Sequence, residues 1–342
     1  MDTDLLSRVG LMDQVAGIRH YRLADGVGAG ASVFAVHNRA GLRYTVVAEK
    51  CLDLFDFQYR GVNFAFRSKN GLVHPGRIGP QADDFYTSWG GGMLATCGLA
   101  NVGVSCEHEG LHPIHGRIGS APARLVQADE RWVGDDLMLE VRAEMSESRL
   151  YGRNLTLRRC VSTSLDSKSV QVRDEVTNLA ATEEPIFLLY HVNIGHPLLD
   201  EDTMVGWNAE LDDTSVPFRM GAPTSGVPMA TTLHRDGTQA AAAVVVNERL
   251  SLGLGIEWDR DQLPFMHQWR NRAPGDYVLA IEPATCPVSG RVEALRSAQI
   301  PFLPGYGVAS FGLTLTVLDG EEEIDGFIDR TGTNPATKRE AG

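Results

Sequence analysis

Apolar residues alternate with other residues along several stretches of the chain, and this period of two constrains the fold more than any other feature of the sequence. The pattern is clearest over residues 42–48, 137–143, 250–256 and 311–317. Successive side chains of a β-strand point to opposite faces of its sheet, so the pattern predicts strands with one buried face. Helical periodicity is scarce, and 36 glycines and 16 prolines disfavour long helices. We therefore predict an all-β fold in which large antiparallel sheets pack face to face.

The sequence divides into one candidate domain and a distinct C-terminal segment. No linker rich in proline, serine or glycine interrupts residues 15–318, and all-β chains of this length often form a single unit. We expect one domain over residues 1–318. Residues 319–342 begin with an acidic run and end polar, which predicts a flexible tail. The alternative is that the apolar patch at residues 324–328 docks on a neighbour.

Charge and cysteine content exclude several classes of function. The net charge is −13 and no cluster of lysine or arginine occurs, which argues against binding to nucleic acid or to an anionic membrane. Five cysteines without a CxxC spacing favour reduced thiols. The acidic N-terminus does not resemble a signal peptide, and no apolar run is long enough for a membrane span. We expect a cytoplasmic protein, a monomer or homodimer, whose ligand is a neutral or weakly charged small molecule.

Residues 88–120 combine glycine, histidine and tryptophan in a pattern typical of a ligand-binding loop. Three consecutive glycines follow Trp89, and three histidines lie close together, the last being His115. Glycine permits close backbone approaches that other residues exclude, so we interpret this stretch as a loop wrapped around a ligand. His115 and Arg117 could present an imidazole and a guanidinium to an oxygen-rich ligand. The alternative for Arg117 is an ion pair within the fold.

Two ionisable residues lie in strongly apolar surroundings. His191 lies within the sequence FLLYHVNIGHPLL, where a period of two places it on the same strand face as Asn193 and Gly195. It is either a core histidine or a site residue that faces a cavity. Glu282 follows an apolar run and precedes Pro283 at the predicted end of a strand. A half-enclosed carboxylate there would be a good proton acceptor near neutral pH, and the alternative is an exposed strand-end glutamate.

Other residues could contact a polar ligand without being reactive themselves. His74 lies in a second glycine-containing segment, and His267, Gln268 and Trp269 are consecutive. An aromatic face stacks on the apolar face of a sugar ring while histidine and glutamine bond its hydroxyls. Core packing is the alternative for each aromatic residue.

The histidines do not form a convincing metal-binding motif. The spacings within residues 108–115 fit a zinc site only loosely, and glycine and proline interrupt them. We predict no required metal.

Three of these segments resemble the galactose mutarotase-like (aldose 1-epimerase) superfamily, and most closely its functionally unassigned bacterial branch. They are GGMLATCGL at residues 91–99, LYHVNIGHPLL at 189–199 and IEPATC at 281–286, and the resemblance covers about residues 8–318. It implies a β-supersandwich with the site on a concave sheet face. It also implies that Glu282 is the catalytic base, His191 the acid and His115 the second family histidine. The family's hydroxyl-binding aspartate has no clean match, and His267 or Gln268 lies nearest to its position.

The resemblance implies an enzyme that interconverts the anomers or epimers of a free sugar or sugar acid. Glu282 would take the proton of the anomeric hydroxyl while His191 protonates the ring oxygen, and the ring would open and close again. No cofactor is needed, because no electrons are transferred. One alternative is another sugar isomerase, metal-assisted through His74, His115 and His191. The other is a carbohydrate-binding or sensor protein without catalytic activity.

Overall fold

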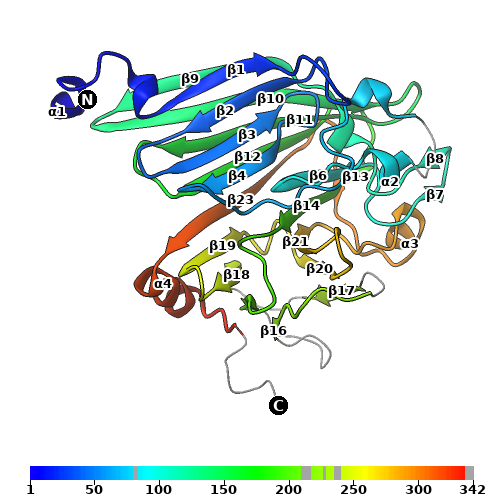
Figure 1. The fold of residues 1–342 in the computed structure, drawn as a ribbon. Helices are drawn as coiled ribbons and strands as arrows, with labels where there is room; N and C mark the ends of the chain where they lie inside the picture. The colour runs from blue at the N-terminus through cyan, green and yellow to red at the C-terminus, as the bar shows by residue number, and fades with distance from the viewer. Residues whose placement is uncertain (80–83, 209–216, 226–228, 235–239, 336–342) are drawn as a thin grey trace.

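The computed structural model describes residues 1–79, 84–208, 217–225, 229–234 and 240–335, and antiparallel sheets dominate it (Figure 1). The prediction of an all-β fold is confirmed. A nine-stranded sheet has the order β16 (Phe218–Arg219), β15 (Met204–Trp207), β18 (Ala241–Asn247), β19 (Leu252–Trp258), β23 (Val308–Asp319), β12 (Ser169–Asn178), β11 (Asn154–Ser164), β10 (Asp136–Ser148) and β9 (Arg124–Val133).

Two five-stranded sheets pack on the same face of the nine-stranded sheet. The first has the order β1 (Gly17–Arg22), β2 (Ser32–His37), β3 (Leu42–Val47), β4 (Asp53–Tyr59) and β5 (Val62–Asn63). The second has the order β17 (Met229–His234), β20 (Phe265–Asn271), β21 (Val278–Ala284), β14 (Phe187–Ile194) and β6 (Leu94–Leu99). One large apolar core contains side chains from all three sheets, so the arrangement is a sandwich with one long layer facing two shorter ones.

The remaining elements are short. Two-stranded sheets are formed by β13 (Glu184–Pro185) with β22 (Phe302–Leu303), and by β7 (Cys106–Glu107) with β8 (Leu111–His112). The helices are α1 (Thr3–Leu6), η1 (Met12–Gln14), η2 (Pro75–Arg77), α2 (Asp84–Ser88), η3 (Ile118–Ser120), α3 (Arg291–Arg296) and α4 (Glu321–Thr331). All five cysteines are free thiols, as expected. Within the described ranges, no helix is long and apolar enough to cross a membrane.

The alternating segments form strands, with one difference. Residues 42–47 form β3 and residues 137–143 lie in β10, and the apolar positions at every second residue are buried in both strands. The segment at 250–256 becomes a strand only from Leu252, and both faces of β19 are buried rather than one. The reason is helix α4, which covers the outer face of β18 and β19 (Figure 1).

The C-terminal segment therefore differs from the expected flexible tail over residues 321–331. In α4, Ile324 and Phe327 are buried and pack with Val244 and Leu318 in a small apolar cluster. A side chain on Gly255 would collide with the ring of Phe327 at 2.3 Å, so this glycine makes room for the helix. The apolar patch docks on the sheet of its own chain. Residues 336–342 lie outside the described residues.

A buried ionic network joins the sheets near the site. Arg159 on β11 donates to both carboxylate oxygens of Asp174, at 2.9 and 2.6 Å, and to Asp53 at 2.6 Å. Asp174 also accepts from the hydroxyl of Tyr190 at 2.7 Å, and Asp53 accepts from the backbone amide of Thr96 at 2.8 Å. A fully buried arginine needs such partners to offset the loss of its hydration. The network ties β4, β11 and β12 to strands β6 and β14, which carry the candidate site.

Candidate active site

His191 and Glu282 lie opposite each other on neighbouring strands. The register of β14 and β21 pairs Leu189 with Ala284 and Val192 with Ile281, which sets His191 beside Glu282. Directly opposed residues of an antiparallel pair project from the same face. Nε2 of His191 lies 3.2 Å from Oε1 of Glu282, and each residue is 4% exposed. Both side chains project from the face of the sheet that turns away from the main core.

The row of paired residues continues on both sides of these two. On β20, His267 pairs with Glu282, and on β6, Ala95 pairs with His191. The sheet therefore presents Ala95, His191, Glu282 and His267 in this order on one face, with neighbouring strands about 4.8 Å apart. Because side chains alternate between the two faces of β14, His191 and Asn193 project from this face.

Asn193 holds the imidazole of His191 in one tautomer. The Asn193 amide nitrogen donates to the carbonyl oxygens of Gly92 at 2.9 Å and of His191 at 2.8 Å, which orients the amide. Its oxygen can then only accept, so the Nδ1–H of His191 donates to it. Nε2 is left to exchange a proton with Glu282. The expected contact between Asn193 and a ligand is absent from this geometry, because Asn193 is fully buried and bonds to the protein.

The apolar surroundings disfavour charge on both groups. Burial raises the pKa of Glu282 to about 8. Burial, and secondarily the nearby His115, lowers the pKa of His191 to about 3. Both shifts favour the uncharged pair, in which the Glu282 carboxyl donates to Nε2 of a neutral imidazole. The two groups share one proton over the neutral pH range and titrate as a unit.

Aromatic rings enclose the pair. The rings of Trp89, His115 and Trp269 lie with their centroids 5.3, 5.6 and 5.8 Å from that of His191, each in an edge-on arrangement. Phe85 of α2 stacks on Trp89 and contacts His115, at 5.6 and 5.5 Å. Such a wall offers flat apolar surfaces beside two hydrogen-bonding groups, which is the character of a sugar-binding site.

His115 is held by its backbone in a conformation that is uncommon for a residue with a side chain. Its φ is +57°, its amide donates to the carbonyl of Gly103 at 2.9 Å, and its carbonyl accepts from the amide of Gly98 at 2.9 Å. The amide of Gly103 also donates to Nδ1 of His115 at 3.4 Å, so the proton of the neutral ring is on Nε2. Burial lowers the pKa of His115 to about 4, and the ring is therefore a neutral N–H donor at neutral pH.

The three consecutive glycines serve the fold of the loop itself. Added side chains at Gly90, Gly91 and Gly92 would lie 2.4 to 2.8 Å from backbone oxygens of neighbouring segments. The glycines therefore allow close packing of backbone on backbone, and Gly90 and Gly91 also line a cavity together with Trp89 and His115. That packing brings Trp89 against His191.

Several residues expected at the site lie elsewhere. Gln268 pairs with the core residue Ile281 and so projects from the opposite face to His267 and Trp269. Arg117 is exposed, and its charge acts on the buried carboxyl of Glu147. His74 caps η2 through Nδ1, which accepts from the amide of Gly76 at 3.0 Å.

His267 remains on the site face, where its Nε2 donates to the carbonyl of Cys286 at 3.0 Å and its ring stacks on Phe265. Phe85 was not anticipated, although the sequence FYTSW that contains it is visibly aromatic. Over the described part of the chain, no group of three or more His, Cys, Asp or Glu side chains is arranged to hold a metal ion. The alternative set of His74, His115 and His191 is thus not gathered into one place.

Comparisons with known proteins agree with the fold. Residues 28–317 match the family described as "Domain of unknown function (DUF4432)". A Klebsiella pneumoniae protein, named as a candidate aldose 1-epimerase, superposes with a TM-score of 0.85 and 21% identity, covering 97% of this chain and 90% of that one.

More distant structures show the same sandwich. A galactose mutarotase-like protein from Clostridium acetobutylicum has a TM-score of 0.62 and 14% identity, covering 90% of this chain and 99% of its own. Galactose 1-epimerase from Lactobacillus acidophilus has a TM-score of 0.60 and 12% identity, with 90% and 100% covered. No curated protein sequence matches the chain. The resemblance to the galactose mutarotase-like superfamily is confirmed at the level of the fold.

Proposed function

We propose that this chain, which belongs to the DUF4432 family, is a carbohydrate isomerase that interconverts the anomers of a free sugar or sugar acid. The function of that family is unknown, so the proposal is based on the geometry of the site. The observation that carries the proposal is the contact of 3.2 Å between His191 and Glu282 among aromatic rings. A carboxyl and an imidazole that share one proton form a matched base and acid.

Ring opening of a cyclic sugar needs these two groups at two adjacent oxygens. The anomeric hydroxyl oxygen and the ring oxygen are bonded to the same carbon, so the base and the acid must lie side by side. Glu282 and His191 meet this requirement because they occupy opposed positions on neighbouring strands. A sugar that enters the pocket would place its anomeric hydroxyl at the Glu282 carboxylate and its ring oxygen at Nε2 of His191.

The proton balance follows from the burial of the pair. Transfer of the shared proton from Glu282 to His191 creates the carboxylate base and the imidazolium acid. Glu282 then takes the proton of the anomeric hydroxyl, His191 protonates the ring oxygen, and the bond between the anomeric carbon and that oxygen breaks as the aldehyde forms. This leaves a protonated Glu282 and a neutral His191, which is the form that burial favours. Rotation of the aldehyde and reversal of the steps would give the other anomer.

The neighbouring residues support the two reactive groups. Neutral His115 would donate from Nε2 to the ring oxygen or an adjacent hydroxyl. Trp89 and Trp269 would contact the apolar face of the sugar. The free thiols support a cytoplasmic location for this activity.

Substitution of the base tests the proposal. Polarimetry on single anomers of a panel of sugars and sugar acids would measure turnover, and calorimetry would measure binding. We expect Glu282→Gln to lower turnover by about 10²-fold or more while the sugar still binds. Glu322→Gln, on the exposed face of α4, is the matched control and should behave as wild type.

Normal turnover in Glu282→Gln would overturn the proposal. Binding of a sugar by the wild type, with no acceleration of mutarotation for any member of the panel, would instead favour the carbohydrate-binding alternative.

A further inference from the structure

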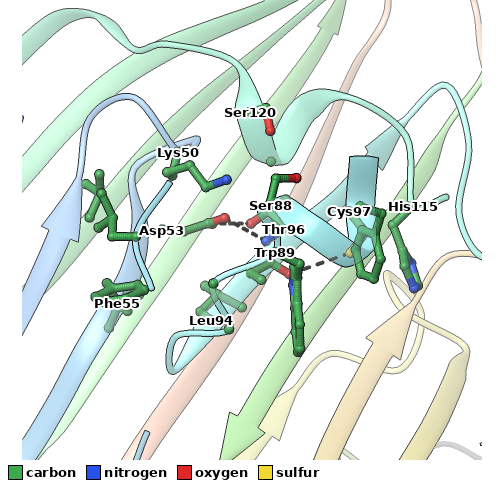
Figure 2. Close-up of a pocket in the computed structure, with 18 of the residues that line it drawn as sticks. Lys50, Asp53, Phe55, Ser88, Trp89, Leu94, Thr96, Cys97, His115 and Ser120 are labelled. Atoms are coloured by element: carbon green, nitrogen blue, oxygen red, sulfur yellow. Dashed lines mark hydrogen bonds between the residues drawn. The ribbon is translucent and has the colours of Figure 1, made fainter. Parts of the chain in front are cut away.

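A cavity lined by residues of strand β6 lies beside the proposed catalytic pair (Figure 2). Its volume is about 80 Å³, and most of its lining is apolar. Trp89 and His115, whose rings contact His191, also line this cavity, as does Ala95, which pairs with His191. The cavity therefore begins one strand away from His191.

Lys50 places an ammonium group at the wall of this cavity. Figure 2 shows its side chain extending into the cavity from the side opposite Cys97 and His115. Within the described residues the ammonium makes no hydrogen bond or close ion pair. Burial lowers the pKa of Lys50, and the charge of the nearby Asp53 partly offsets this shift. The carboxylate of Asp53, which lines the same cavity, is already bonded to Arg159 and to both donors of Thr96. Because the carboxylate of Asp53 is already engaged by these donors, the half-buried ammonium of Lys50 keeps its own donor capacity for an anionic ligand.

Ser120 adds a second polar group to the same cavity. Its hydroxyl, like the ammonium, has no hydrogen-bond partner among the described residues, and Ser120 lines the same cavity as Lys50 (Figure 2). The Ser88 hydroxyl also lines the cavity, where it donates to the carbonyl of Asp84. An ammonium and hydroxyls set in an apolar wall are suited to an anionic oxygen group.

The order of the strands matches the order of atoms along a pyranose. Across the sheet, Glu282 on β21 is followed by His191 on β14 and by Ala95 and the cavity at β6. In a pyranose, the anomeric hydroxyl is followed by the ring oxygen and then by the ring carbon that carries the exocyclic carbon. If Glu282 takes the anomeric hydroxyl and His191 the ring oxygen, the exocyclic substituent points towards the cavity.

We propose that the cavity binds an anionic group on the exocyclic carbon of the sugar, with Lys50 as its counter-ion and Ser120 as a hydrogen-bond donor. The substrate class would then be a pyranose that carries a carboxylate or a phosphate next to its ring oxygen. This inference rests on the proposed function for the placement of the sugar. One water needs roughly 10–15 Å³ of such space, so about 80 Å³ accommodates a group of a few heavy atoms.

The test compares sugars that differ only at the exocyclic carbon. Galactose, galacturonate and galactose phosphorylated on that carbon form one set, and the glucose and mannose series form two more. Mutarotation rates and dissociation constants would be measured for wild type, Lys50→Met and Ser120→Ala. Lys168→Met, which removes an ammonium paired with Glu323 far from the cavity, is the matched control. The uronate and phosphate arms distinguish the two sources of negative charge.

We expect wild type to prefer an anionic sugar over its neutral counterpart by about 10- to 100-fold in affinity or kcat/KM. Lys50→Met should abolish this preference by lowering the affinity and kcat/KM for the anionic sugar to those for its neutral counterpart. Lys168→Met should keep the preference.

Three results separate the proposals from each other. A preference for anionic sugars that persists in Lys50→Met, or the absence of a preference in all three series, overturns the anionic subsite. If wild type accelerates mutarotation of a neutral sugar in that case, the proposed function stands alone. Binding of an anionic sugar that depends on Lys50, without acceleration of mutarotation, supports the subsite and overturns the proposed function.

Discussion

The buried carboxyl of Glu282 makes a prediction about folding stability that needs no substrate. Its pKa is about 8 in the folded protein against 4.5 for an ordinary glutamate. Between these two pH values the unfolded chain ionises Glu282 while the folded chain keeps it protonated. A carboxyl whose folded pKa is raised contributes stability below about pH 4.5, and this stability is lost as the pH rises towards 8. The substitution Glu282→Gln keeps the shape and removes the titration.

The magnitude follows from the gap of about 3.5 pH units. At about 1.4 kcal/mol for each unit, the wild type would lose up to about 5 kcal/mol relative to Glu282→Gln on going from pH 4.5 to 8. His191 can take up the proton and stabilise the carboxylate, so this value is the upper end, and we expect about 2 to 5 kcal/mol. At pH 4.5 the two proteins should differ by no more than about 1 kcal/mol, because the glutamine amide can also donate to Nε2 of His191.

Urea denaturation at pH 5, 6, 7 and 8 would measure the difference in the free energy of unfolding. Glu322→Gln, in which an exposed glutamate is changed, should follow the wild type throughout. The reasoning is refuted if the advantage of Glu282→Gln does not grow with pH over this range. A constant difference would mean that the carboxylate is ionised in the folded protein, and hence that the uncharged pair is not the resting form of the pocket.

Two further predictions concern a positioning residue and helix α4. Asn193→Ala should lower turnover by about 10-fold or more and change the pH profile of turnover, because the tautomer of His191 is then no longer fixed. Asn193→Asp keeps the hydrogen-bond acceptor and should retain more activity. Equal activity of Asn193→Ala and wild type would contradict this role. Phe327→Ala should lower the free energy of unfolding by about 3 kcal/mol, because it leaves a void against Gly255. Phe302→Ala changes a side chain that is 48% exposed and should lower it much less. Equal losses from both variants would argue against the docking of α4.

The strands and the orientation of His191 could be predicted from the sequence because both depend on local geometry. The backbone of a strand points successive side chains to opposite faces, so the alternation at 42–48 and 137–143 identified β3 and β10. The same rule placed His191 and Asn193 on one face. The same rule places Gln268 and His267 on opposite faces of β20, so both side chains cannot contact one ligand on the site face.

The contacts between distant segments were decided only by the tertiary structure. The docking of α4 buries the second face of β19. The sequence pattern of residues 250–256 does not predict this burial, because the helix that packs there comes from the C-terminal part of the chain. The family resemblance suggested His191 and Glu282 as a pair, but their separation of 3.2 Å depends on the register of β14 against β21. No local pattern in the sequence indicates the role proposed for Lys50, because the cavity that it lines is formed by segments distant in the chain. Strand pairing and enclosure are set by packing across the sandwich, where the free energy of burial depends on which distant segments meet.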